Sequence, residues 1–184
     1  VVAVVSVLDM PFEWYRQFRI EQAYGFNRMT LGLFIADTLK SLLLAGALGL
    51  PITAAVLWLM DSAGDLWWLY AWVVWIAFNG LVLVLYPTVI APLFNKFEPL
   101  KDASLATRID ALLSRTGFSS RGVFVMDGSR RSSHGNAYFT GLGRAKRIVF
   151  FDTLVERLLP SEIEAVLAHE LGHFKLRHVT KRLA

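Results

Sequence analysis

Residues 41–60 read SLLLAGALGLPITAAVLWLM and contain no charged side chain. About 20 apolar residues in an α-helix cross the roughly 30 Å hydrocarbon core of a bilayer. A second uncharged stretch covers residues 66–95. Membrane helices tolerate prolines such as Pro51 and Pro87 better than soluble helices do. The sequence therefore predicts two membrane spans, near residues 41–60 and 66–90.

The charges around these stretches predict their orientation. The connection at residues 61–65, DSAGD, is short and acidic, whereas Lys40 precedes the pair and Lys96 follows it. Because loops rich in Lys and Arg stay in the cytoplasm, we expect the short loop outside and everything after Asn95 inside. The net charge of +4 comes from scattered basic residues with no recognition motif, so we expect no nucleic-acid partner.

The start of the chain is also apolar. Residues 1–8 lack the basic region and cleavage site of a signal peptide, and we interpret them as the end of a further span. The chain is 55% hydrophobic and contains no cysteine, which excludes disulfides and thiolate metal sites.

Near the other end lies His169-Glu170-Leu171-Gly172-His173. Two histidines four residues apart share one face of a helix and can bind one metal ion through neutral imidazole nitrogens. Glu170, next to the first histidine, can take a proton from a metal-bound water. This H-E-x-x-H arrangement is typical of zinc metallopeptidases and predicts Zn²⁺ as the cofactor.

The surrounding sequence predicts a helix. Ser161 is the expected N-cap, and Glu164 three residues later would complete a capping box. Apolar residues recur at helical spacing and predict a buried face: Ile163, Val166, Leu167, Leu171 and Phe174.

The third zinc ligand is not evident in the chain. The metzincin pattern requires Gly at 176 and His at 179, where this sequence has Leu176 and Val179. His178 lies about 140° around a continuing helix from His173, and His134 can approach from a loop without any spacing that requires it. We expect the third ligand beyond Ala184, and therefore a fragment that lacks both ends, with weak zinc binding and little activity.

The intervening residues predict a small sheet beside this helix. Residues 102–116 fit an amphipathic helix with an apolar stripe and a stop at Gly117. Strands are expected at 123–126, 137–139 and 147–151, with a turn at 141–143. The edge of such a sheet can pair with an extended substrate, and Asn136 and Tyr138 would then present polar groups at the cleft. The alternative is a turn residue at 136 and a core aromatic at 138.

In four blocks the chain resembles the integral-membrane CAAX prenyl endoproteases, zinc metallopeptidases of type I. The residues that carry the resemblance are Pro11-Phe12 with Tyr24-Gly25-Phe26-Asn27, Tyr86-Pro87 with Pro92-Leu93-Phe94-Asn95-Lys96-Phe97, His134 with Asn136-Ala137-Tyr138 and Phe151-Asp152-Thr153-Leu154, and the H-E-x-x-H motif.

The resemblance implies a ring of membrane helices around a chamber, with the zinc site on its cytoplasmic side. It implies that His169 and His173 bind zinc, that Glu170 is the general base, and that a Glu on a later helix is the third ligand. Asn136, Tyr138 and, in the same block, His134 would line the substrate cleft. The substrates implied are prenylated CAAX proteins or other membrane-associated proteins, cleaved near the C-terminus.

The composition suggests a bacterial homologue in the inner membrane, where membrane protein quality control is an alternative role. A non-catalytic scaffold or chaperone that retains the zinc helix is a rival, and so is a membrane metalloenzyme other than a peptidase.

Together these patterns predict a mainly α multi-pass membrane protein with a small α+β zinc-metallopeptidase domain. Residues 1–95 would form the membrane region. Residues 96–184 would form the metallopeptidase domain on the cytoplasmic side, truncated at its C-terminus.

Overall fold

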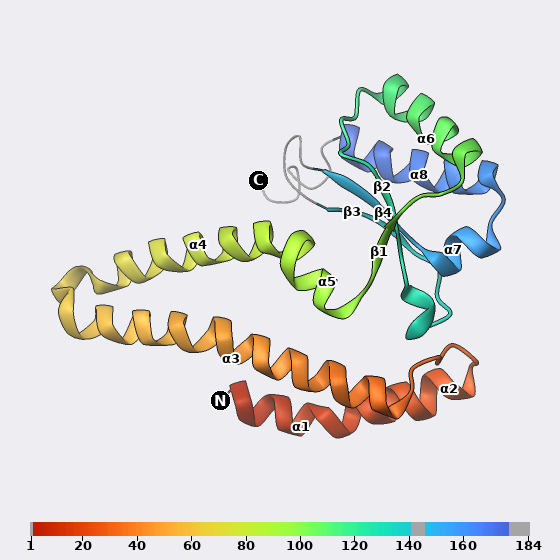
Figure 1. Ribbon diagram of the computed structural model, residues 1–184. Coiled ribbons are helices and arrows are strands. Elements are labelled where there is room, and N and C mark those ends of the chain that lie inside the picture. The colour runs from red at the N-terminus through yellow and green to blue at the C-terminus, as the bar shows by residue number, and fades with distance from the viewer. Residues whose placement is uncertain (1, 141–145, 177–184) are drawn as a thin grey trace. The chain divides into compact units, whose positions relative to one another are not determined.

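The computed structural model describes residues 2–140 and 146–176, with residues 2–4 and 173–175 described by their backbone alone (Figure 1). The chain forms two compact units. Residues 31–94 make one, which we call the hairpin unit. Residues 1–30 and 95–184 make the other, the sheet unit.

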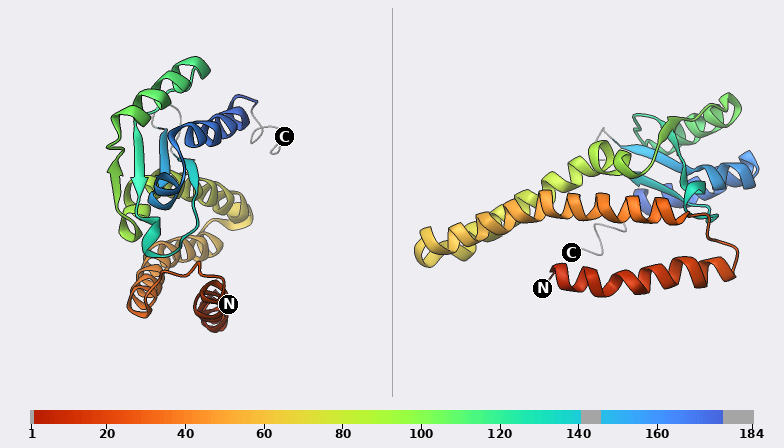
Figure 2. Two further views of the ribbon diagram at one scale, coloured as in Figure 1. Left: turned by 90° about the vertical axis from the view of Figure 1, so that its right-hand side faces the viewer. Right: turned by 60° about the horizontal axis from the view of Figure 1, so that its bottom comes forward.

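The hairpin unit consists of two long helices that pack against each other (Figures 1 and 2). Helix α3 covers Leu31–Ser62, and a 3₁₀ turn at Gly64–Leu66 leads into α4, Trp67–Leu85. A π-helical turn at Tyr86–Ile90 and the short α5, Ala91–Phe94, follow. The turn contains Pro87, whose missing N–H interrupts the α-helical hydrogen-bond pattern.

Two helical segments are long and apolar enough to cross a membrane, Leu31–Ser62 and Gly64–Phe94. No residue of α3 or α4, both described throughout, is buried, although their sequences are almost entirely apolar. A surface of this kind is stable in lipid because every backbone polar group is bonded inside the helix. The two predicted spans are thus confirmed as membrane-capable helices.

Helix α3 begins ten residues before the predicted span. The prediction covered only uncharged residues, whereas a helix can continue through a charged one, and lysine is a good helix former. The Lys40 Nζ donates to the Leu93 carbonyl oxygen at 2.9 Å and lies 5.9 Å from the centre of the Phe94 ring.

The sheet unit is built on four strands in the order β1-β2-β4-β3. They are β1 Phe97–Pro99, β2 Val123–Met126, β3 Ala137–Thr140 and β4 Arg147–Phe151. Strands β2 and β4 are parallel, and the two outer pairings are antiparallel. The three predicted strands are confirmed, with β3 one residue longer. The turn expected at 141–143 lies outside the described residues.

Strand β1 was not predicted. It has only three residues and ends at Pro99, so it offers no readable alternation and contains a residue that is confined to sheet edges. Its place at one edge of the sheet agrees with that preference.

Two helices cover one face of the sheet and form the core with it (Figures 1 and 2). They are α6, Ala103–Thr116, and α8, Pro160–Lys175. The predicted stripe of α6 is buried, and Gly117 ends the helix with φ 69°, as expected. The fully buried side chains at the centre come from both helices and β4: Leu105, Ile109, Ile148, Phe150, Ile163 and Leu167.

The predicted start of α8 was wrong. The helix begins at Pro160, so Ser161 lies inside its first turn and does not cap it. The Glu162 carboxylate accepts from the Leu159 N–H at 2.8 Å, the bond that Glu164 was expected to make two residues later. Pro160 explains the shift, since its fixed φ and missing N–H suit the first helical position.

The sheet unit contains further helical segments. Helix α1, Val2–Tyr15, continues through a π-helical turn at Arg16–Ile20 into α2, Glu21–Ala23. A 3₁₀ turn lies at Gly128–Arg130, and α7, Asp152–Arg157, follows β4 directly. Residues 1–8, expected to end a further membrane span, fall largely in α1, and that role stays a prediction.

Replacing Asp102 with Ala tests the cap of α6. Its Oδ1 accepts from the Leu105 N–H at 3.0 Å and satisfies a donor that the helix itself leaves unpaired. The loss should cost about 1 kcal/mol and lower the thermal midpoint by a few degrees in detergent micelles. Asp110→Ala on the exposed side of the same helix is the matched control. Equal midpoints for the two variants would contradict the capping role.

Candidate active site

Helix α8 places the H-E-x-x-H residues by burying its opposite side. Ile163, Leu167 and Leu171 lie one turn apart and are buried against the sheet. His169 is about 200° around the helix from Leu167, and its side chain is exposed. Glu170 is half-buried at the border between the two sides. The motif therefore lies on the side of α8 that faces away from the core.

The second histidine follows on the same helix. The α-helical backbone continues through Lys175, so positions 169 and 173 are one turn apart, as a shared metal requires. The side chain of His173, like all of His178, lies outside the described residues.

The donor chemistry fits a borderline ion such as zinc, but it is incomplete. A catalytic zinc takes three protein ligands and keeps a position for water. Among the side chains that the structure describes, which leave out that of His173, there is no group of three His, Asp or Glu that could hold a metal. The described residues thus offer part of a ligand set.

His134 lies elsewhere in the sheet unit. Its ring stacks on Phe26 with centroids 4.1 Å apart, and its Nε2 is 3.3 Å from Glu21 Oε2. Its carbonyl oxygen accepts from Thr153 Oγ1 at 2.8 Å. These contacts hold His134 to the N-terminal segment and α7.

Asn136 immediately precedes the edge strand β3. Its carbonyl oxygen accepts from the Phe151 N–H at 2.9 Å, and its Oδ1 accepts from the Ala137 N–H at 2.8 Å. In an antiparallel ladder the bonded pairs alternate, so residues 138 and 140 bond toward β4. The backbone groups of Ala137 and Phe139 point to the open edge, where Asn136 already occupies the Ala137 N–H.

Tyr138 lies on the sheet face opposite α6 and α8. Ala137 and Phe139 pack against the core, so the alternation of side chains places Tyr138 on the other face. Its hydroxyl donates to Met126 Sδ at 3.8 Å, and its ring meets Phe151 edge-on at 6.2 Å. Tyr138 therefore lies on the sheet face opposite α8, the helix that carries His169.

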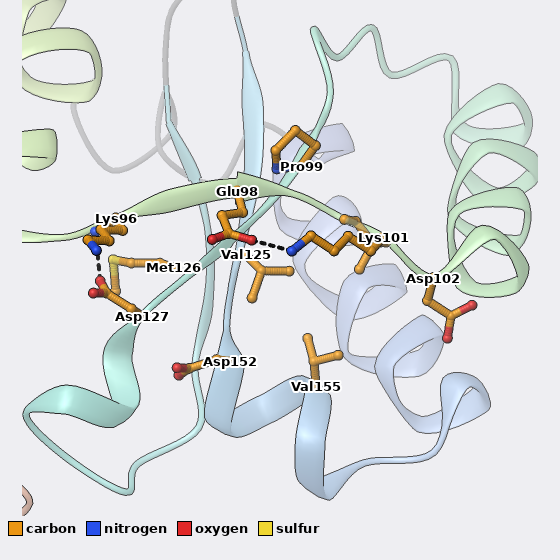
Figure 3. Close-up of a pocket in the computed structure, with 11 residues that line it drawn as sticks. Lys96, Glu98, Pro99, Lys101, Asp102, Val125, Met126, Asp127, Asp152 and Val155 are labelled. Carbon is orange, nitrogen blue, oxygen red and sulfur yellow. Dashed lines mark hydrogen bonds and ion pairs between the residues drawn. The ribbon is translucent and has the colours of Figure 1, made fainter.

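A pocket of about 380 Å³ lies between β1 and α7 (Figure 3). Both apolar residues, such as Val125 and Val155, and charged residues, such as Glu98 and Lys101, line it. Lys101 Nζ donates to Glu98 Oε2 at 2.6 Å, which lowers the pKa of Glu98 and raises that of Lys101. No residue of the H-E-x-x-H motif or of 134–138 lines this pocket.

The loop before β3 contains contacts that the sequence did not reveal. Asp152, at the start of α7, accepts from both the N–H and the hydroxyl of Ser129. The buried Thr153 holds His134 from the same helix. In the sequence, Asp152 and Thr153 stand out only as part of a block of family resemblance, because a contact across 19 or more residues leaves no periodic signal.

Two family profiles match the chain. The profile described as CAAX prenyl protease N-terminal, five membrane helices, covers residues 1–96. The profile of peptidase family M48 covers residues 99–184, which include β2 to β4 and the H-E-x-x-H helix.

Curated relatives and a solved structure agree. The chain is 45% identical over 184 residues to a CAAX prenyl protease 1 homolog of Dictyostelium discoideum, covering 99% of this chain and 43% of the relative. It is 46% identical over 176 residues to CAAX prenyl protease 1 of Saccharomyces cerevisiae, covering 95% and 39%. The crystal structure of S. mikatae Ste24p matches with a TM-score of 0.90 at 43% identity, over 99% of this chain and 42% of that one.

The chain thus spans less than half the length of these relatives. They are eukaryotic and give no support to the bacterial origin suggested by composition. The resemblance noted in the sequence is confirmed over nearly all of its length, as is a mainly helical, multi-pass membrane fold with a small sheet. The chain belongs to the CAAX prenyl protease family of M48 metallopeptidases.

Proposed function

We propose that this chain is part of a membrane zinc metalloendopeptidase that cleaves prenylated or other membrane-associated proteins near the C-terminus. The observation that carries the proposal is the exposed side of α8, where His169 stands one turn before position 173 with Glu170 beside it. Family membership supports the same reaction. Because the relatives are more than twice as long, the complete protein would supply the rest of the site.

We assign zinc binding to His169 and His173, with the third ligand outside residues 1–184. When bound, zinc supplies Lewis acidity toward the scissile carbonyl and lowers the pKa of its water. The helix contributes the spacing of the two imidazoles, and the buried side of α8 fixes the direction in which they project.

Glu170 acts as the general base in this proposal. Its half-buried position beside His169 would leave the carboxylate accessible to a water held at the metal. It would accept the proton of that water and then deliver it to the amine of the departing peptide.

The open edge of β3 is the proposed substrate-binding element. The carbonyl of Ala137 and the backbone groups of Phe139 face this edge, and an extended peptide can add as a further strand. Asn136 would orient the first residue of the edge through its bond to the Ala137 N–H. Tyr138 and His134 would then support β3 from the far face and from the preceding loop.

We propose that residues 96–184 form the peptidase domain on the cytoplasmic side and that residues 1–95 form the membrane region. The acidic connection between the spans and the basic residues that flank them support this orientation. We do not extend the proposal to a bacterial inner membrane, because the relatives named above are eukaryotic.

Glu170→Gln in the complete protein should abolish peptide cleavage while zinc is retained, because the amide cannot accept a proton. The loss should be at least about 100-fold in kcat, in keeping with the removal of a general base. Cleavage of a membrane-associated peptide and metal analysis of the same preparation provide the measurements. Glu156→Gln, on α7, is the matched control. Full activity of the Glu170 variant would refute the assignment, and zinc without turnover in the wild type would favour a scaffold.

His169→Ala should lower the zinc content of the complete protein to well below one ion per chain. One of three protein ligands is removed, and the remaining pair binds too weakly to survive dialysis. Metal analysis after dialysis measures the effect independently of activity. If this variant still bound one zinc ion per chain, the metal site would have to be assigned to residues other than those of α8.

Substrate pairing with β3 predicts an alternating sensitivity to backbone methylation. Only every second amide of an extended peptide faces its partner strand. N-methylation at those positions should raise KM about five-fold for each lost hydrogen bond, and methylation at the positions between should not. A uniform response along the peptide would exclude strand addition.

A further inference from the structure

The segment at 25–28 pairs with the loop at 131–133 inside the sheet unit, across more than 100 residues of sequence. Asn27 stands opposite Ser132 in an isolated antiparallel bridge. Two backbone hydrogen bonds flank it: Arg28 N–H to the Arg131 carbonyl at 3.1 Å and Ser133 N–H to the Phe26 carbonyl at 2.9 Å. The N-terminal segment is thus joined to the loop that leads into β3.

The Asn27 side chain fixes the shape of this segment. Its Oδ1 accepts from Gln17 Nε2 at 2.6 Å and from the Met29 N–H at 2.8 Å. Its Nδ2 donates to Gln22 Oε1 at 2.9 Å. Gln17 belongs to the π-helical turn, a local irregularity that is frequent at functional sites. These three hydrogen bonds, to three different residues, fix the orientation of the Asn27 side-chain amide.

Glu21 holds both sides of the pairing. Its carbonyl oxygen accepts from the N–H groups of Phe26 and Asn27, at 2.8 and 3.1 Å. Its carboxylate reaches across to His134 Nε2 at 3.3 Å, and the imidazole rests on the Phe26 ring. The Glu21 side chain is 29% exposed and the His134 side chain 53%, so water reaches this contact mainly from the side of the histidine.

The opposite side of the loop is held by α7. Thr153, itself buried, donates to the His134 carbonyl oxygen. Gly135 lies so close to this helix that a Cβ would come within 3.3 Å of the Leu154 Cα. His134 is therefore fixed by its ring on one side and by its carbonyl on the other.

Only Gly135 separates this clamped histidine from Asn136, where the bonding to β4 begins. A displacement of His134 would also displace Asn136 and the start of β3, because the single residue between them, Gly135, is too short to compensate for it. We propose that Glu21 is a positioning residue for peptide hydrolysis, which acts through His134 to hold β3 in register for substrate. The proposal rests on the proposed function and adds a role for the N-terminal segment.

Glu21→Ala in the complete protein is the test. The backbone bonds of residue 21 remain, so the segment keeps its fold while His134 loses its partner. The backbone amides of β3, followed in a proteolytic fragment that contains this strand, should exchange their hydrogens about five-fold faster, as expected for a lost hydrogen bond. KM for an extended peptide substrate should rise about five-fold with kcat within two-fold, because binding rather than chemistry is weakened.

Two variants serve as controls. Glu21→Gln keeps an oxygen that accepts from the imidazole and should restore both values to within about two-fold of wild type. Glu13→Ala removes an exposed glutamate of α1 that pairs with Arg16. It should change neither the exchange rate of β3 nor the KM. If Glu21 acts through His134, then adding Glu21→Ala to a His134→Ala variant should not increase the exchange rate of the β3 amides any further.

Unchanged exchange in Glu21→Ala overturns the proposal, and so does faster exchange with an unchanged KM. A lower kcat at constant KM also overturns it, since that result would place Glu21 in the chemistry. If the wild type itself cleaves no peptide, the proposed function fails, while the exchange measurements still decide whether Glu21 holds β3.

Discussion

The packing of α8 against β4 is the interaction on which the candidate site depends. Ile163, Leu167 and Leu171 lie over Ile148 and Phe150, and all five side chains are at most 2% exposed. Burying an aliphatic or aromatic side chain of this size contributes about 1.5–3 kcal/mol. This burial sets the rotation of α8 about its axis. A rotation by one residue would move His169 by about 100° and would bury a polar side chain.

The same core explains why β3 is available. Strand β4 is bonded on both sides, whereas β3 has β4 as its one partner among the described strands. An open edge exposes unpaired backbone groups and invites pairing with other chains. In this sheet the edge is short, and Asn136 covers the Ala137 N–H. Four residues limit unspecific pairing but still suffice for a short extended peptide.

Much of this arrangement was predictable because it rests on periodicity. The apolar stripes of α6 and α8, the strands at 123–126 and 147–151 and the uncharged spans all follow from local spacing. The elements that were not predicted are too short to show a periodic pattern of apolar residues. Strand β1 has three residues, and α7 has six. The start of α8 was misplaced because two capping signals overlap, and the geometry of Pro160 outweighed the polar preference of Ser161.

The candidate site divides along the same line. His169, Glu170 and His173 were predicted because four-residue spacing on a helix is visible in sequence, and the structure confirms the helix while their roles stay a prediction. The role of His134 was open, since a loop histidine carries no information about its neighbours. The structure shows that its ring lies on Phe26 and near Glu21, more than 100 residues earlier. These contacts form because the residues after α2 lie beside the loop that precedes β3, and this proximity exists only in the folded chain. The contacts of the N-terminal segment therefore end two residues before β3, because Gly135 and Asn136 stand between His134 and the first residue of the strand, Ala137.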